Sequence, residues 1–172
     1  MTTLIGLRGI IGSGKTTIAK ELNKLIINSE IKNFAKPMKD ALKELGISKE
    51  SHPELARKLL QFIGGECRKE DSDFWVKLAK EKIHQSYCNF IIFDDVRHEN
   101  EISLFNKPNY LFNIYRQEAV DKMEISMALD EDTYFHESER FNARNLKSGP
   151  GKLIINNKPI DEVINEILGH IE

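Results

Sequence analysis

The chain of 172 residues has few cysteines and no pattern typical of metal ligands. Its two cysteines, Cys67 and Cys88, are far apart and form no CxxC unit, so we expect reduced, partly buried thiols rather than a disulfide framework. The five histidines show no ligand spacing such as HExxH. A structural metal centre is therefore not expected.

Long hydrophobic runs are also missing. No stretch approaches the roughly 20 apolar residues needed to cross a bilayer. The N-terminus, "MTTLIGLRGIIG", has no basic segment followed by an apolar run and a cleavage site. We therefore expect a cytoplasmic protein with no membrane partner.

Neither sign of charge is in large excess. The 25 Lys and Arg residues face 27 Asp and Glu residues, which gives a formal net charge of -2. This balance, without a basic stripe of interleaved aromatics, argues against a nucleic-acid partner. Apolar residues make up 40% and charged residues 30%, as in ordinary globular proteins. The length fits a single domain over residues 1–172 and leaves the oligomeric state open, a homodimer included.

Short β-rich runs alternate with helical periods, which predicts an α/β fold with a parallel sheet flanked by helices. Ligands of such sheets bind beyond the carboxyl ends of the strands. Between Gln117 and Gly149 the pattern degrades into charged and small residues, which favours a mobile excursion. The expected strands are "TLIGL", "KNFA", "NFIIFDDVR", "YLFNIYR" and "KLIIN".

Helices are expected after the glycine-rich turn, from Pro37 to a stop at Gly46, and from Pro159 to the end of the chain. Another begins at Pro53 and is expected to end at the Gly64–Gly65 pair, and the next is capped by Asp71 or Ser72. Periodicity predicts the inward side chains, which include Leu45, Leu55, Leu59, Phe62 and Ile63.

The stretch "GLRGIIGSGKTT" satisfies GxxxxGK[ST] between an expected strand and an expected helix. Glycines let the backbone turn tightly so that N–H groups point inward, and the helix N-terminus favours anionic oxygens. Lys15 is predicted to reach the β and γ phosphates, and Thr16 to offer its hydroxyl to Mg²⁺. ATP is the expected ligand, because "NKPN" and "NKPI" lack the acid of the guanine signature NKxD. The candidate nucleotide-binding residues of this loop are Gly9, Gly12, Ser13, Gly14, Lys15, Thr16 and Thr17.

Acidic and basic residues follow the most apolar strand, in "FIIFDDVRHENE". Asp94 and Asp95 end this strand, at the edge of the sheet where the phosphate loop is expected. One of them is suited to hold a metal-bound water or to orient an acceptor, and Asp95 is the candidate metal residue together with Thr16. Arg97 is suited to grip an anionic group through two hydrogen bonds.

These segments occur together with "NFAKPMKDAL", "LLQFIGGECRKEDSDFWVKLA" and a late "HESE". Over nearly its whole length the chain resembles the deoxynucleoside monophosphate kinases of the type found in bacterial viruses. The resemblance implies a P-loop nucleoside monophosphate kinase fold with a five-stranded parallel sheet. It also implies a substrate-binding helical region at about 35–88 and a lid at about 117–149.

The resemblance further implies roles for single residues. Lys15, Asp95, Arg97 and Arg140 form the implied catalytic set, and Arg144 is a further nucleotide contact. Arg116, Arg140 and Arg144 are the arginines available to the lid, and their order in the sequence leaves open which of them contacts ATP. Trp75 is equally typical of a core residue, Lys39 of a solvated helix charge and His136 of a loop surface. The implied acceptor-binding residues are Lys39, Arg57, Gln61, Arg68, Trp75, Arg97, Glu101, His136 and Glu139.

The expected reaction moves the γ-phosphoryl group of ATP, bound with Mg²⁺, to the 5′-phosphate of a deoxynucleoside monophosphate. Such an acceptor is largely dianionic at neutral pH and needs no strong base. The alternative is a kinase of another small metabolite, similar to dephospho-coenzyme A or gluconate kinases, where the acceptor is a hydroxyl and Asp95 serves as the base. A third reading is a module that binds ATP without turnover.

Overall fold

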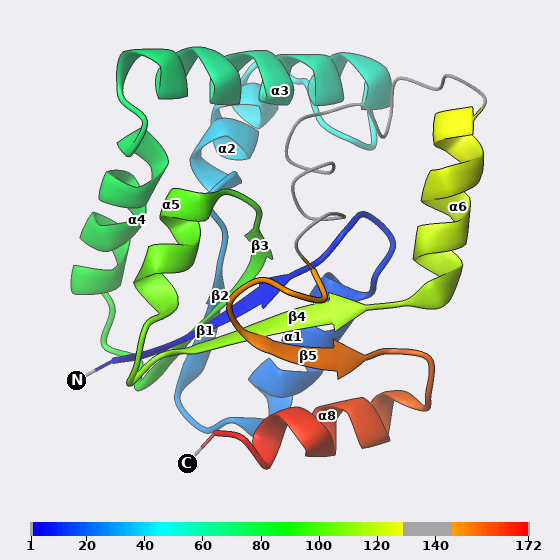
Figure 1. The fold of residues 1–172 in the computed structure, drawn as a ribbon. Helices are drawn as coiled ribbons and strands as arrows, with labels where there is room; N and C mark the ends of the chain where they lie inside the picture. The colour runs from blue at the N-terminus through cyan, green and yellow to red at the C-terminus, as the bar shows by residue number, and fades with distance from the viewer. Residues whose placement is uncertain (1, 129–145, 172) are drawn as a thin grey trace. The chain divides into compact units, whose positions relative to one another are not determined.

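Five strands form one parallel sheet in the computed structural model, which describes residues 2–128 and 146–171 (Figure 1). The strands lie in the order β2-β3-β1-β4-β5. The connection from β1 leaves toward β2 and the connection from β4 leaves toward β5, so the crevice between β1 and β4 is the topological switch point. The strands are β1 (Thr3–Arg8), β2 (Ser29–Lys32), β3 (Phe90–Val96), β4 (Tyr110–Tyr115) and β5 (Lys152–Ile155).

The chain divides into two compact units. The sheet unit comprises Met1–Ile31 and Tyr87–Glu172, and the helical unit comprises Lys32–Ser86. The helical unit spans nearly the same residues as the region 35–88 of the sequence analysis. Its role in binding an acceptor stays a prediction.

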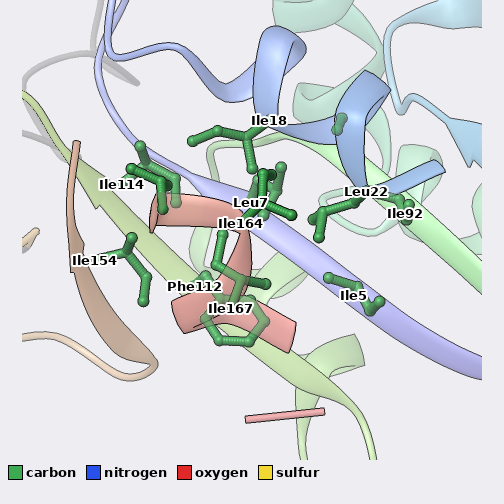
Figure 2. Close-up of a cluster of buried hydrophobic side chains, with 12 residues drawn as sticks. Ile5, Leu7, Ile18, Leu22, Ile92, Phe112, Ile114, Ile154, Ile164 and Ile167 are labelled. Carbon is green, nitrogen blue, oxygen red and sulfur yellow. The ribbon is translucent and has the colours of Figure 1, made fainter. Parts of the chain in front are cut away.

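One face of the sheet is covered by α1 (Lys15–Leu25) and α8 (Ile160–Leu168). The side chains that meet there come from alternate positions of the strands and from one stripe of each helix, as Figure 2 shows. Both stripes agree with the predicted periodicity. The buried cluster consists of Ile5, Leu7, Ile18, Ala19, Leu22, Ile92, Phe112, Ile114, Ile154, Val163, Ile164 and Ile167.

The other face of β1 is in contact with η1 (Ser103–Phe105), which follows α5 (Glu99–Ile102). A Cβ at Gly6 would lie 2.8 Å from the ring of Phe105, so only glycine leaves room for this ring. Phe105 also packs edge-on against Phe93, with ring centroids 5.8 Å apart. The bare backbone of Gly6 therefore lets η1 lie close to the sheet.

The segment after β4 is a helix, α6 (Gln117–Ala128). No helix is expected from the sequence at these residues, and the interpretation of 117–149 as a mobile excursion stays a prediction. Ala119 and Met123, one turn apart, pack against Ile10 of the phosphate loop. This short stripe is too weak a periodic signal to stand out from its charged neighbours.

The helical unit contains α2 (Lys36–Glu44), α3 (Pro53–Glu70) and α4 (Phe74–His84). We expected a helix end at the Gly64–Gly65 pair, but α3 continues through it to Glu70. The Gly64 carbonyl accepts hydrogen bonds from Trp75 Nε1 (3.3 Å) and Arg68 Nη1 (2.8 Å). These bonds help to keep the backbone helical at a glycine pair whose low helix propensity favours a helix end. In the part of the chain that the structure describes, no helix is long and apolar enough to cross a bilayer.

Several side chains that periodicity placed inside lie at the surface instead. Leu55 and Phe62 of α3 are exposed, Phe62 to 64%, whereas the small residues Ala56 and Gly64 are buried. Helix α2 ends before Leu45, which is also exposed. On α3 the small residues Ala56 and Gly64 therefore lie on the inner face, beside large buried side chains of the same unit such as Met38 and Trp75.

The second strand lies earlier than predicted, at Ser29–Lys32 rather than at "KNFA". Asn28, with a positive φ of 56°, turns the chain after α1. Its carbonyl then accepts the N–H groups of Asn89 (2.9 Å) and Phe90 (3.3 Å). This turn fixes where β2 begins. In the sequence, the turn is indicated only by Asn28.

Candidate active site

The carboxyl ends of four strands meet at one edge of the sheet. Arg8 at the end of β1 is in register with Val96 of β3 and with Asn113 of β4, and Tyr115 of β4 is in register with Ile155 of β5. The residues that follow these ends therefore converge. They are the loop Gly9–Gly14, Arg97, Arg116 and Asn156.

The loop between β1 and α1 needs glycine at three positions, for lack of space at Gly9 and for backbone conformation at Gly12 and Gly14. A Cβ at Gly9 would lie 2.6 Å from the Ile114 carbonyl oxygen and 2.6 Å from Ser13 Oγ. Gly12 and Gly14 have positive φ angles of 81° and 93°, a region that L side chains rarely adopt. The first N–H groups of α1 have no partner within their helix, so the turn presents backbone donors where an anion is expected.

The ammonium group of Lys15 lies within this loop. Its Nζ donates to the carbonyl oxygens of Gly9 (2.8 Å) and Ile10 (2.7 Å) and to Ser13 Oγ (3.3 Å). The residue is 8% exposed. The loop carbonyls and the Ser13 hydroxyl therefore surround the Lys15 ammonium, and these hydrogen bonds stabilise the loop conformation.

Asn156, directly after β5, connects three parts of the site. Its Nδ2 donates to the Ser13 carbonyl (2.8 Å), and its backbone N–H donates to the Tyr115 carbonyl at the end of β4 (2.7 Å). A Cβ on Gly14 would lie 2.4 Å from the same Nδ2. One residue, through its side chain and its backbone, thus fixes the loop against the ends of β4 and β5.

We expect Asn156→Ala to weaken the binding of ATP. The change removes the hydrogen bond to Ser13 and frees the loop, which should cost about 1 kcal/mol, or roughly fivefold in Kd. Isothermal titration with a non-hydrolysable ATP analogue measures the effect. Asn165→Ala, at an exposed position on α8, is the matched control. Equal affinities for the two variants would contradict the role given to Asn156.

A pocket of about 480 Å³ adjoins the loop. Gly14 and Thr17 form its side next to the loop, and the residues after β4 and β5 form the rest. The Gln117 N–H donates to Asn157 Oδ1 (2.9 Å), which joins the two strand ends across the pocket. The lining is completed by Arg116, Gln117, Glu118, Asn156, Asn157, Lys158 and Ile160.

The charged side chains that line this pocket form ion pairs, Arg116 with Glu118 of the lining and Lys158 with Glu166 outside it. Arg116 Nη2 lies 2.6 Å from Glu118 Oε2, and Lys158 Nζ lies 2.6 Å from Glu166 Oε2. A hydrogen bond from Lys122, with the positive charge of Arg116 nearby, holds the pKa of the Glu118 carboxyl below its usual value. The guanidinium of Arg116 is thereby oriented at the wall of the pocket.

Asp94 and Asp95 lie beside the phosphate loop, because β1 and β3 are parallel neighbours. The register between the two strands shifts after Gly6, where two residues of β1 are matched by three of β3. Such a bulge turns side chains relative to a regular strand. Asp94 is buried, at 8% exposure, while Asp95 is half-buried, so Asp95 is the more accessible carboxylate.

Glu101 has a different contact from the one the resemblance implies. It is 2% exposed, and its Oε2 accepts the backbone N–H groups of Arg97 (2.7 Å) and His98 (3.0 Å). This carboxylate holds the backbone of the turn that carries Arg97. A direct contact of Glu101 with an acceptor stays a prediction, as does that of Arg97.

The remaining implied acceptor residues divide between the helical unit and the part of the chain outside the described ranges. Trp75 is buried in the helical unit and shares the Gly64 carbonyl with Arg68, so it has a structural contact of its own. Lys39 is exposed on α2, and Arg57 and Gln61 are half-buried on α3. His136, Glu139, Arg140 and Arg144 lie outside the described residues.

Sequence reasoning missed the residues that form the pocket wall. Asn157 and Lys158 of "NKPI" line the pocket, although this segment carries no motif beyond its partial likeness to the guanine signature. The buried Arg8 at the end of β1, where desolvation lowers the guanidinium pKa, was not singled out either. The usable signal was positional, because each of these residues follows or ends an expected strand.

The chain is similar to known proteins mainly in its fold. A family model described as an AAA domain matches residues 5–145. No curated protein sequence matches significantly. Three solved structures illustrate the likeness, and at these identities they show the fold alone. A shikimate kinase from Aquifex aeolicus has 18% identity and a TM-score of 0.54, and the match covers 96% of this chain and 94% of that one. A gluconokinase from Sinorhizobium meliloti has 11% identity and a TM-score of 0.50, with coverage of 98% and 91%. A tunicamycin resistance protein from Deinococcus radiodurans has 16% identity and a TM-score of 0.51, with coverage of 99% and 96%.

Proposed function

Because the chain belongs to the AAA-domain family and has a P-loop kinase-like fold, we propose that it is a phosphotransferase that moves the γ-phosphoryl group of ATP to a small-molecule acceptor. The observation that carries this proposal is the continuity between the phosphate loop and the adjoining pocket. Gly14 belongs to both. A nucleotide with its phosphates on the loop therefore extends into the pocket.

The pocket suits a nucleobase in size and chemistry. Its volume of about 480 Å³ falls in the usual range for small-molecule sites. A guanidinium such as that of Arg116 stacks on flat aromatic rings, and Ile160 supplies an apolar surface. The amides of Gln117 and Asn157 are within the lining and can pair with the polar edge of a base.

The loop residues then position the triphosphate. The N–H groups at the start of α1 bind phosphate oxygens, and the Lys15 ammonium exchanges the Gly9 and Ile10 carbonyls for oxygens of the β and γ phosphates. Positive charge placed where negative charge spreads during transfer lowers the barrier, since the groups need not reorganise. Arg97, on a turn fixed by Glu101, is suited to hold an anionic group of the acceptor.

The donor set at this edge also fits Mg²⁺. Thr16 is exposed in the first turn of α1, and Asp95 ends the neighbouring β3. In residues 2–128 and 146–171, no group of three or more His, Cys, Asp or Glu side chains is placed to hold a metal ion. A site of one or two protein oxygens completed by substrate phosphates is the usual arrangement for Mg²⁺, which when bound neutralises charge on the β and γ phosphates.

A small metabolite with a hydroxyl group is the acceptor that we favour. The solved structures with the same fold include a shikimate kinase and a gluconokinase, which supports an acceptor of this class. A hydroxyl must lose its proton as the phosphorus–oxygen bond forms, and a positioned carboxylate is suited to accept it. Asp95 is the half-buried carboxylate at the correct edge of the sheet.

A deoxynucleoside monophosphate is the second candidate acceptor. The sequence segments "AKPMKDAL" and "LLQFIGGECRKEDSDFWVKL" favour it, because they carry the resemblance to that kinase family. Helix α3 carries Arg57 and Arg68, whose cations are suited to bind an acceptor phosphate.

A coupled assay of ADP release tests the proposal. ATP and Mg²⁺ are held constant, and one panel contains shikimate, gluconate and dephospho-coenzyme A while the other contains the deoxynucleoside and nucleoside monophosphates. We expect release above the background of ATP hydrolysis with a member of the first panel. Release only with the second panel would move the assignment to the nucleotide acceptor. ATP binding without release in either panel would refute a kinase of both classes.

A further inference from the structure

A second cavity, of about 600 Å³, lies at the opposite edge of the sheet. It is lined by the amino ends of β4 and β5, by the chain around η1 and by His170 after α8. Phe112 of β4 is in register with Lys152 of β5, which places both near the starts of their strands, at the tails of the arrows in Figure 1. None of its lining residues lines the pocket beside the phosphate loop.

The floor of this cavity is apolar. The Tyr110 ring is parallel to the Phe112 ring, with an interplanar angle of 5° and centroids 6.4 Å apart, and the His170 ring stacks on Phe112 with centroids 6.3 Å apart. Phe112 is only 1% exposed, so Tyr110 and His170, both half-buried, carry the accessible ring surface. Phe105 and Leu111 line the cavity from the other face of the sheet. Aromatic rings at such a surface favour a planar apolar body.

The walls are held by contacts that do not involve a ligand. Asn109 Oδ1 accepts the Leu4 N–H and its Nδ2 donates to the Leu104 carbonyl, both at 2.9 Å. Gly151 has a φ of 104°, and a Cβ there would lie 2.9 Å from the Leu111 carbonyl oxygen. The glycine therefore allows the chain entering β5 to lie against β4. The cavity is preformed, which lowers the entropy cost of binding.

The rim of the cavity is positively charged. Lys107 and Lys152 line it, both are exposed, and no ion pair joins either to a carboxylate among the residues that the structure describes. Elsewhere in the sheet unit, Lys24, Lys122 and Lys158 each have a carboxylate within 2.7 Å. No lining residue is acidic. The two ammonium groups thus stand beside an apolar floor without the acidic partners that other lysines have.

We propose that this cavity is a second binding site, separate from the nucleotide site, for a small amphipathic anion with a planar ring body and a carboxylate or phosphate group. The ring lies against Tyr110 and His170, and the anionic group lies between Lys107 and Lys152. Planar apolar contact supplies the burial, and the lysines select the charge. The proposal does not depend on the reaction at the phosphate loop.

Anilinonaphthalene sulfonate is a suitable probe, because it combines flat rings with one anionic group and fluoresces in apolar sites. We expect saturable binding to the full chain in the presence of saturating ATP and Mg²⁺. The double variant Lys107→Glu/Lys152→Glu should weaken it by roughly tenfold or more, since two attractions become repulsions. The control is Lys80→Glu/Lys82→Glu, which makes the same change of charge at exposed positions of α4.

Amide chemical shifts locate the probe, and competitors define its anionic group. The amides of Leu111, Gly151 and His170 should shift on titration. Displacement by salicylate or by phenyl phosphate supports the site and identifies the preferred group. The proposal is overturned if the two double variants bind alike, if ATP displaces the probe, if only amides of the phosphate loop shift, or if neither competitor acts.

Discussion

Replacing Lys15 with methionine is expected to lower the rate of phosphoryl transfer by about a thousandfold. Methionine has a similar length and no charge, so it removes the cation that faces the developing charge on the transferred group. The ADP-release assay with the accepted substrate measures this loss. Among the single substitutions considered for this site, we expect the largest kinetic effect here.

The same change also acts on the loop itself. Lys15 Nζ donates to two loop carbonyls and to Ser13 Oγ, and methionine donates to none of them. Losing these buried hydrogen bonds should lower the free energy of unfolding by about 1–3 kcal/mol. Thermal unfolding separates this effect from the kinetic one, because a folded but inactive variant identifies the charge as the cause.

Lys20→Met is the matched control for Lys15→Met. Lys20 is exposed on the same helix, five residues further along, so the same chemical change is made away from the loop. We expect its rate and melting temperature to stay near those of the parent chain. A Lys15→Met protein that is folded and turns over at the parent rate would refute the assignment of the phosphate loop.

Asp95→Asn should distinguish the two acceptor classes. If the acceptor is a hydroxyl, loss of the base should reduce the rate by about 100-fold or more, since general bases contribute about 10²- to 10⁴-fold. If the acceptor is a phosphate, deprotonation is already complete and the same substitution should act mainly through the metal. The measurement is the rate with each accepted substrate, together with the affinity for ATP in the presence and absence of Mg²⁺.

Asp161→Asn is the control for Asp95→Asn, because Asp161 is exposed in the first turn of α8 and lies outside the pocket lining. A hydroxyl acceptor used at the parent rate by Asp95→Asn would rule out Asp95 as the base. The buried Asp94 would then be the next carboxylate to test.

The parts of the fold predicted from the sequence are those with strong local signals. The phosphate loop was predicted because its motif fixes the glycine positions that the tight turn requires. Strands β3, β4 and β5 were predicted because each is a short apolar run. The sheet and its helical cover follow from their alternation with periodic helices. These elements needed no knowledge of distant contacts.

The features that were missed depend on contacts between distant residues. Helix α3 continues through Gly64 and Gly65 in a unit where Trp75 and Arg68 bind the Gly64 carbonyl. The pocket forms only where the ends of β4 and β5 lie side by side. No local sequence pattern predicts this, because the hydrogen bond between Gln117 and Asn157 joins residues far apart in the chain. The candidate acceptor residues were found through family resemblance, and their roles stay predictions.

The hydrogen bond between Asn156 and Ser13 joins residues that are 143 positions apart. During synthesis the glycine-rich turn is therefore made well before the residue that restrains it. Until β5 has emerged from the ribosome, the turn lacks this hydrogen bond. The affinity of a nascent chain for a nucleotide should accordingly rise once Asn156 can reach Ser13.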